Sequence, residues 1–204
     1  PSLNAAIYSY GERILKDRYE KQPEDQKQAV VAYLMNLYDE WLLHFPTRRN
    51  VKVEGDIISS KAQSMIDFKM PDKMETYKTF DLAFTTDPES FTNPKGLYNY
   101  FKILYDLYKE DNHGVTMEQL FTKYEEVSEK FEIELTNLAK KLDIILKKEE
   151  EGNPISSREI RSKRVYGINS NAIATFLRNL DAIISKEATC VNLVPLYQRN
   201  FEEN

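Results

Sequence analysis

The sequence predicts a mainly α-helical protein, a multi-helix bundle followed by a C-terminal helical unit with little β-structure. Apolar residues recur at intervals of three and four along most of the chain, which is the period of an amphipathic helix. Two S/T-x-x-E/Q capping boxes, Thr116 with Gln119 and Ser156 with Glu159, mark helix starts. The chain also contains 13 Tyr and 10 Phe, which is far too many for a disordered protein, so it must fold around a core.

The N-terminal elements follow from this periodicity. We expect helices over 3–22, 24–45 and 56–68, the second led by a proline and two acids that suit a first turn. Between the last two, residues 47–55 are polar and turn-like, and Val51 and Val53 alternate as in a short strand. Three cations there, Arg48, Arg49 and Lys52, are interpreted as a solvated loop in preference to a phosphate site.

Residues 73–94 are less regular. They fit a short helix or an irregular apolar segment that ends in a stretch dense with turn residues. Asn93 and Pro94 then form a helix-start signature, and residues 97–108 are apolar nearly all round. We interpret their aromatic side chains as core and not as a stacking platform for bases, because leucines are interleaved and few cations lie nearby.

A break at 111–114 separates this helix from the rest, and we place a domain boundary there, between a helical bundle at 1–112 and a helical domain at 113–204. The alternative is a single bundle. Residues 117–151 carry one helix, or two with a break near Ser128, and Gly152 ends the pattern.

The C-terminal segment contains two helical patterns joined by a basic turn. The first begins at Ser156 and is short, and Gly167 is a natural turn residue that separates it from the second. In the second pattern one face is apolar, comprising Ile173, Phe176, Leu177, Leu180 and Ile184. Asn171, Thr175 and Arg178 fall on another face.

This pair of patterns resembles the helix-turn-helix core of the winged-helix superfamily, over about 45 residues. The resemblance implies that the second helix is a recognition helix, with Asn171, Thr175 and Arg178 facing a groove of DNA. The cations of the turn would contact phosphates, namely Arg158, Arg161, Lys163 and Arg164. The apolar run 189–197 is expected to form a wing strand, with Cys190 as a buried thiol.

The charge of the chain is unevenly distributed. The net charge is −5, which argues against a protein that coats nucleic acid over its whole surface. Residues 153–200 hold seven cations against three acids, a local charge of +4, and the remainder carries −9. A basic segment therefore belongs to an otherwise acidic chain.

No active site is visible in the sequence. There are two histidines, His44 and His113, and one cysteine, so we expect no metal site, no cofactor and no enzyme activity. Glycine-rich phosphate loops and a nucleophile elbow are missing among only 6 glycines, and no small-molecule substrate is evident.

Location follows from the same simple counts. A lone cysteine suits a reducing compartment, no apolar stretch is long enough to span a membrane, and no signal peptide pattern opens the chain. We expect an intracellular protein of the cytoplasm or nucleus, without a membrane partner.

Two functions remain open on these grounds. The first is a DNA-binding accessory module, which would serve as a part of a larger replication or transcription protein. The second is a protein-interaction or adaptor module in which the same C-terminal segment binds a protein partner or forms a homodimer, because one fold serves many functions.

Overall fold

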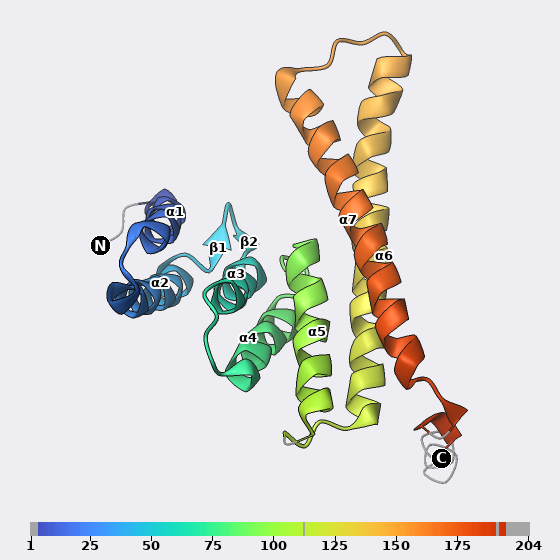
Figure 1. The fold of residues 1–204 in the computed structure, drawn as a ribbon. Coiled ribbons are helices and arrows are strands. Elements are labelled where there is room, and N and C mark those ends of the chain that lie inside the picture. Colours follow the sequence, from blue (N-terminus) through green and yellow to red (C-terminus); the bar gives the residue numbers. More distant parts are fainter. Residues whose placement is uncertain (1–3, 112, 191, 195–204) are drawn as a thin grey trace. The chain divides into compact units, whose positions relative to one another are not determined.

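The computed structural model describes residues 4–111, 113–190 and 192–194. The chain is mainly α-helical, as the sequence predicted, and the β-structure of these residues is one two-stranded sheet (Figure 1). Two compact units divide between Gly96 and Leu97.

The N-terminal unit contains four helices and the small sheet. They are α1 (Ala6–Lys21), α2 (Glu24–His44), β1 (Thr47–Arg48), β2 (Val51–Lys52), α3 (Glu54–Asp67) and α4 (Lys73–Thr86). Each helix packs against the next one along the chain. The helices predicted over 3–22, 24–45 and 56–68 are confirmed as α1, α2 and α3.

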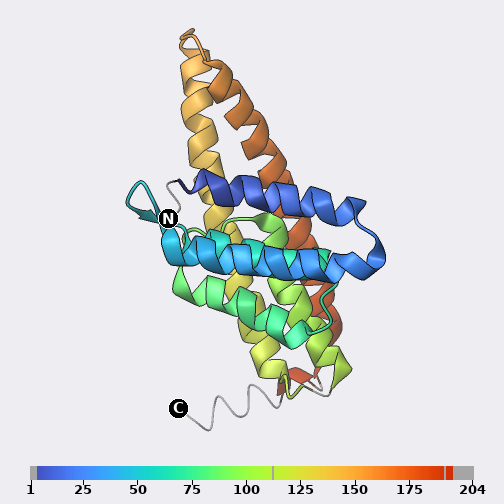
Figure 2. The same ribbon diagram turned by 90° about the vertical axis from the view of Figure 1, so that its left-hand side faces the viewer.

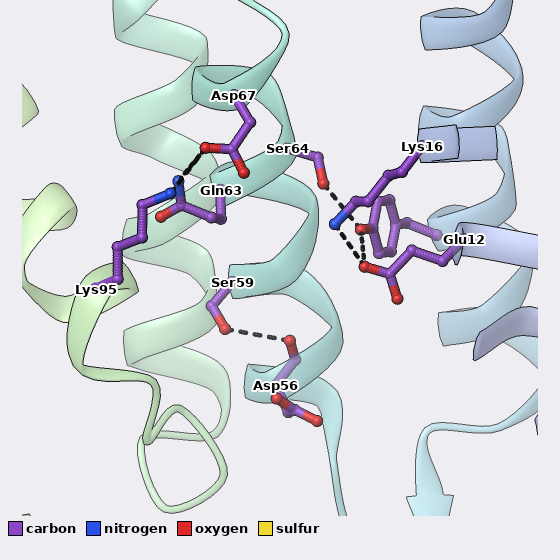
Figure 3. Close-up of polar contacts among 9 residues, drawn as sticks. Glu12, Lys16, Asp56, Ser59, Gln63, Ser64, Asp67 and Lys95 are labelled. Carbon is purple, nitrogen blue, oxygen red and sulfur yellow. Dashed lines mark hydrogen bonds and ion pairs between the residues drawn. The ribbon is translucent and has the colours of Figure 1, made fainter. Parts of the chain in front are cut away.

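A buried tyrosine joins the first three of these helices. Tyr38 of α2 is 1% exposed and packs with Leu34 and Ile57. Its hydroxyl donates to Glu12 Oε1 of α1 at 2.8 Å and shares a hydrogen bond of 2.9 Å with Ser64 of α3. The two partners, Glu12 and Ser64, are labelled in Figure 3. Burial and then the negative charge of Glu12 raise the pKa of Tyr38, so the hydroxyl stays protonated and bonded.

The start of α3 depends on a glycine that no other residue can replace without movement. The backbone N–H of Gly55 donates to Asp87 Oδ2, and that of Asp56 donates to Ser90 Oγ. These two bonds satisfy amides that a helix start leaves without partners. A Cβ at Gly55 would lie 2.1 Å from the carbonyl oxygen of Asp87, so the loop after α4 approaches α3 closely only because the side chain is absent.

Residues 73–86, for which the sequence left two interpretations open, form the helix α4. Asp72 caps it by accepting from the backbone N–H of Glu75 at 2.9 Å. Phe80 and Ala83 are fully buried. The periodicity was hard to read because threonines interrupt the apolar face.

The second unit is built on a long helical hairpin. Its elements are α5 (Pro94–Glu110), α6 (Met117–Glu150) and α7 (Ser157–Glu187), and the unit includes α5 only from Leu97 onward. At about 1.5 Å per residue, the 34 residues of α6 extend about 51 Å and the 31 of α7 about 46 Å. The two helices run antiparallel and side by side, and the hairpin extends beyond α5 (Figures 1 and 2).

The division between the units lies earlier in the chain than residue 112, where the sequence placed it. Helix α5 belongs with α6 and α7: Tyr98 stacks on Phe176 at 4.8 Å, and Tyr105 and Lys109 both donate to Glu187. The break at 111–114 is therefore a turn between helices of one unit. Helix α6 is continuous through Ser128, which settles the choice between one helix and two.

The predicted wing strand is wrong where the structure describes it. Cys190 and Asn192–Val194 are helical, and residues 195–197 lie outside the described residues. The side chain of Cys190, expected to be buried, is exposed. Thr189 and Val194, two of the β-branched residues that suggested a strand, do not lie in a sheet, and strand propensity depends on packing within one.

Candidate nucleic-acid interface

Helix α7 begins at the capping box that the sequence predicted. Ser156 Oγ accepts from the backbone N–H of Glu159, and Glu159 Oε2 accepts from the backbone N–H of Ser156 at 2.7 Å. Lys148 of α6 also donates to Glu159, at 2.8 Å. The hydrogen bond from Lys148, followed by those from Ser156, lowers the pKa of Glu159 to about 2. The carboxylate therefore stays charged and links the start of α7 to α6.

The turn predicted at Gly167 is wrong. Residues Ser157–Glu187 form one continuous helix, and Gly167 lies inside it. A glycine within a helix costs only about 1 kcal/mol relative to alanine, and packing of the flanking turns outweighs that amount. A separate recognition helix, on which the winged-helix resemblance depended, is therefore missing from residues 157–187.

Packing fixes which side of α7 faces outward. Ile173, Leu180 and Ile184 are buried, and Phe176 stacks on Tyr98 and lies 6.4 Å from the ring of Phe131. These residues are the apolar face predicted from the sequence, which is confirmed. The opposite face is consequently exposed along the helix.

Five of the seven predicted site residues lie on that exposed face in one stripe. Their positions alternate near three and four, with Ile168 filling the one gap, so they share one side of a helix. The stripe consists of Arg161, Arg164, Asn171, Thr175 and Arg178. We call it the α7 stripe. From Arg161 to Arg178 it extends about 26 Å, at about 1.5 Å per residue.

The arginines of the α7 stripe are not neutralised. Arg161 Nε donates to the carbonyl of Ser157 and Arg178 Nε to that of Ala174, which are bonds within the helix itself. Among the described residues, no carboxylate forms an ion pair with Arg158, Arg161, Arg164 or Arg178, and all four are exposed.

Lys163 lies apart from this group. It is half-buried and forms an ion pair of 2.5 Å with Glu149 of α6. Lys163 thus links α7 to α6, whereas the four arginines form no ion pair among the described residues. Arg158 is exposed near the start of α7, to one side of the α7 stripe.

The acidic residues in the C-terminal half of α7 also have hydrogen-bonding partners within the second unit. Asp181 accepts from the hydroxyl of Tyr124 on α6 at 2.7 Å. Glu187, which is 7% exposed, accepts from Tyr105 and Lys109 of α5. Both carboxylates hold the helices of the second unit together.

Two further cations were missed by the sequence reasoning. Lys140 and Lys141 of α6 are exposed, and neither has an ion pair in the described part of the chain. With them, residues 140–178 hold nine cations against five acids, a net charge of +4. The sequence pattern that could have identified them is a pair of adjacent lysines on the polar side of a long amphipathic helix.

The described residues show neither a metal cluster nor a membrane-spanning helix. Within residues 4–111, 113–190 and 192–194, no three His, Cys, Asp or Glu side chains gather as a metal site would require. No helix of these residues combines the length and hydrophobicity that crossing a bilayer demands. Comparisons with models of known protein families, with curated proteins and with solved structures found no match to this chain.

Proposed function

We propose that this protein binds nucleic acid through the outward face of α7. The observation that carries the proposal is the α7 stripe, in which three exposed arginines lie on one side of a helix without carboxylate partners. Arginine suits phosphate and guanine because its planar guanidinium donates two parallel hydrogen bonds. An unpaired, exposed row of such groups offers these bonds without first breaking an internal ion pair.

The distribution of charge supports the same surface. Residues 140–178 carry +4, so the rest of the chain carries −9. Phosphates are repelled by the acidic remainder and attracted to the hairpin, which confines contact to one region.

Each side chain has a role within the proposal. Arg158, Arg161 and Arg164 bind phosphates and set the register, with Lys140 and Lys141 adding charge. Asn171 and Arg178 have the donors and acceptors that suit adenine and guanine, and Thr175 lies between them. A continuous helix can lie in the major groove, as the basic helices of zipper proteins do, so this binding does not need a helix-turn-helix.

The proposal is tested by the salt dependence of binding. Labelled duplex and single-stranded DNA of 20 bases or base pairs would be titrated by fluorescence anisotropy at 50 and 200 mM salt. We expect binding that weakens with salt, because each neutralised phosphate releases counterions. The triple variant R161A/R164A/R178A should weaken binding and reduce the slope of log affinity against log salt by about 2 to 3.

A matched control removes the same charge elsewhere. Arg13, Arg18 and Lys78 are exposed cations of α1 and α4, and the variant R13A/R18A/K78A should bind almost as the parent does. The proposal fails if the parent does not bind at low salt, if its affinity ignores salt, or if both triple variants lose affinity equally.

A second function, binding of a protein partner or a second copy, is favoured by a different observation. Apolar side chains are exposed on both helices of the hairpin: Ile144 of α6 is 68% exposed, and Ile160 and Ile168 of α7 are 55% and 56% exposed. Exposed apolar side chains that lie near one another are typical of surfaces that bind another protein. Light scattering at several concentrations distinguishes this case, since I144D/I160D would convert a dimer to a monomer.

A nucleic-acid-binding module of this kind suits an accessory role in replication or transcription inside the cell. That assignment rests on the proposed binding alone. It falls if binding fails.

A further inference from the structure

The N-terminal unit contains a cavity that has no role in the proposed binding of nucleic acid. It measures about 370 Å³ and lies between the start of α1, the end of α2, the β-hairpin and the start of α3. Ligand sites for small molecules run from about 300 to 1,000 Å³, so this cavity is at the small end of that range. Its lining includes Ser9, Trp41, Phe45, Arg48, Asp56 and Ile57.

One wall of the cavity is aromatic and held in place from behind. Trp41 stacks on Tyr8 with ring centroids 6.0 Å apart, and Phe45 packs on the same ring at 5.8 Å. Tyr8 itself is 4% exposed. The two rings that reach the cavity therefore present a preformed apolar surface.

The cavity also presents two opposite charges that form no ion pair. Arg48 and Asp56 both line it, and neither side chain forms an ion pair or side-chain hydrogen bond within the described residues. Burial, then the negative charge of Glu12, raises the pKa of Asp56, and the positive charge of Arg48 opposes that rise. The guanidinium is thus close enough to act on the carboxylate without pairing with it.

The hairpin that carries Arg48 is strained. Thr47 pairs with Lys52 and Arg48 with Val51, and the two residues between them, Arg49 and Asn50, have φ of +52° and +63°. A two-residue turn of this hand requires positive φ at both positions and favours Asn-Gly. An arginine there is unfavourable, and local strain of this kind gathers at ligand sites.

We propose that this cavity binds a free amino acid with an aromatic side chain. Its carboxylate pairs with Arg48, its ammonium group with Asp56, and its ring packs on Trp41 and Phe45. Opposite charges on one small ligand match the two unpaired charges of the site, and the ring matches the apolar wall. This inference is independent of the nucleic-acid proposal.

The fluorescence of Trp41 reports directly on the cavity, because it is the one tryptophan of the chain. The full chain would be titrated with L-phenylalanine, with excitation at a wavelength that phenylalanine does not absorb. We expect a saturable change. Phenylethylamine lacks the carboxylate and 3-phenylpropionate lacks the ammonium group, so each should bind at least about tenfold more weakly.

Two variants test whether each charge contributes to binding, and a third serves as a control. R48A and D56N should each lose at least about tenfold in affinity for L-phenylalanine, whereas R13A, an exposed arginine outside the cavity, should bind as the parent does. Circular dichroism shows whether each variant is folded. Should one unfold, the two analogues still test the proposal on the unaltered protein.

Three outcomes overturn the inference. They are no saturable fluorescence change with L-phenylalanine, equal affinity for the amino acid and both analogues, and unchanged binding by folded R48A and D56N. Equal affinity for the analogues would mean that only the apolar wall binds.

Discussion

At the residue scale, the contact between Gly55 and Asp87 leaves no room for a side chain at position 55. The glycine permits close approach of two backbones, and the carboxylate of Asp87 accepts from both Ser90 and Gly55. The loop after α4 thereby supplies the cap that the first residues of α3 lack. The start of α3 also lines the cavity through Asp56.

Replacing Gly55 by alanine should be strongly destabilising. The added Cβ would lie 2.1 Å from a carbonyl oxygen, so the backbone must move and the cap is lost. We expect the free energy of unfolding to fall by at least about 2 kcal/mol, measured by urea denaturation. An unchanged urea midpoint would show that the two segments are not in contact.

Asp87 should make the free energy of unfolding depend on pH. Burial by itself raises its pKa, but hydrogen bonds from Ser90 and Gly55 prevail and leave the pKa lowered. A lowered pKa adds stability above the ordinary value of about 3.9, and this is lost as pH falls through the folded value. D87N should therefore be less stable at pH 7 and lose less on acidification.

Urea midpoints of the parent and D87N from pH 7 to pH 2.5 check this prediction. E20Q provides the control, because Glu20 is exposed within α1 and forms no ion pair among the described residues. Parallel curves for the parent and D87N would contradict the role given to Asp87.

At the element scale, the continuity of α7 decides how its charges are presented. One unbroken helix places the α7 stripe along a single line. With a turn at Gly167, the cations before it and Asn171, Thr175 and Arg178 after it would point in unrelated directions. The same continuity lets α7 remain against α6 while its outer face is exposed.

Gly167→Ala tests that continuity. Nothing lies within 4 Å of a Cβ built at Gly167, and the residue is helical, so alanine should raise the free energy of unfolding by about 0.5 to 1 kcal/mol. A turn with positive φ at this position predicts the opposite sign. Thermal and urea unfolding of the variant therefore distinguish a helix from a turn.

At the scale of the whole molecule, charge is divided between a basic hairpin segment and an acidic remainder. The division has a direct consequence for where DNA is expected. With DNA bound, Lys140 and Lys141 should lose reactivity toward a lysine-modifying reagent, whereas the exposed Lys78 of α4 should keep its own. Mass spectrometry of modified peptides measures both, and equal protection of Lys78 would contradict the assigned surface.

Much of the helical structure followed from local patterns. Both capping boxes, the Asn93 cap of α5 and the apolar face of α7 are present as predicted, because each depends on residues within a few positions of one another. The errors include the turn at Gly167 and the strand expected from Thr189 onward. At Gly167, packing of the flanking turns outweighs a local preference, and strand propensity depends on a sheet against which the residues can pack.

The candidate interface was predictable only in part. Periodicity placed Asn171, Thr175 and Arg178 away from the apolar face, but it did not show that Lys163 pairs with Glu149, because that contact joins two helices. The cavity was beyond reach for the same reason. Its walls come from segments as far apart in the sequence as Asn4 and Ile57.

Sequence alone determined the helical class, most of the helix starts and the location of the basic segment, since these depend on neighbours along the chain. The tertiary structure decided which cations remain unpaired, where α5 belongs, and that Trp41, Arg48 and Asp56 share a cavity. Such facts require contacts between residues far apart in the sequence, and only the packed chain brings those residues together.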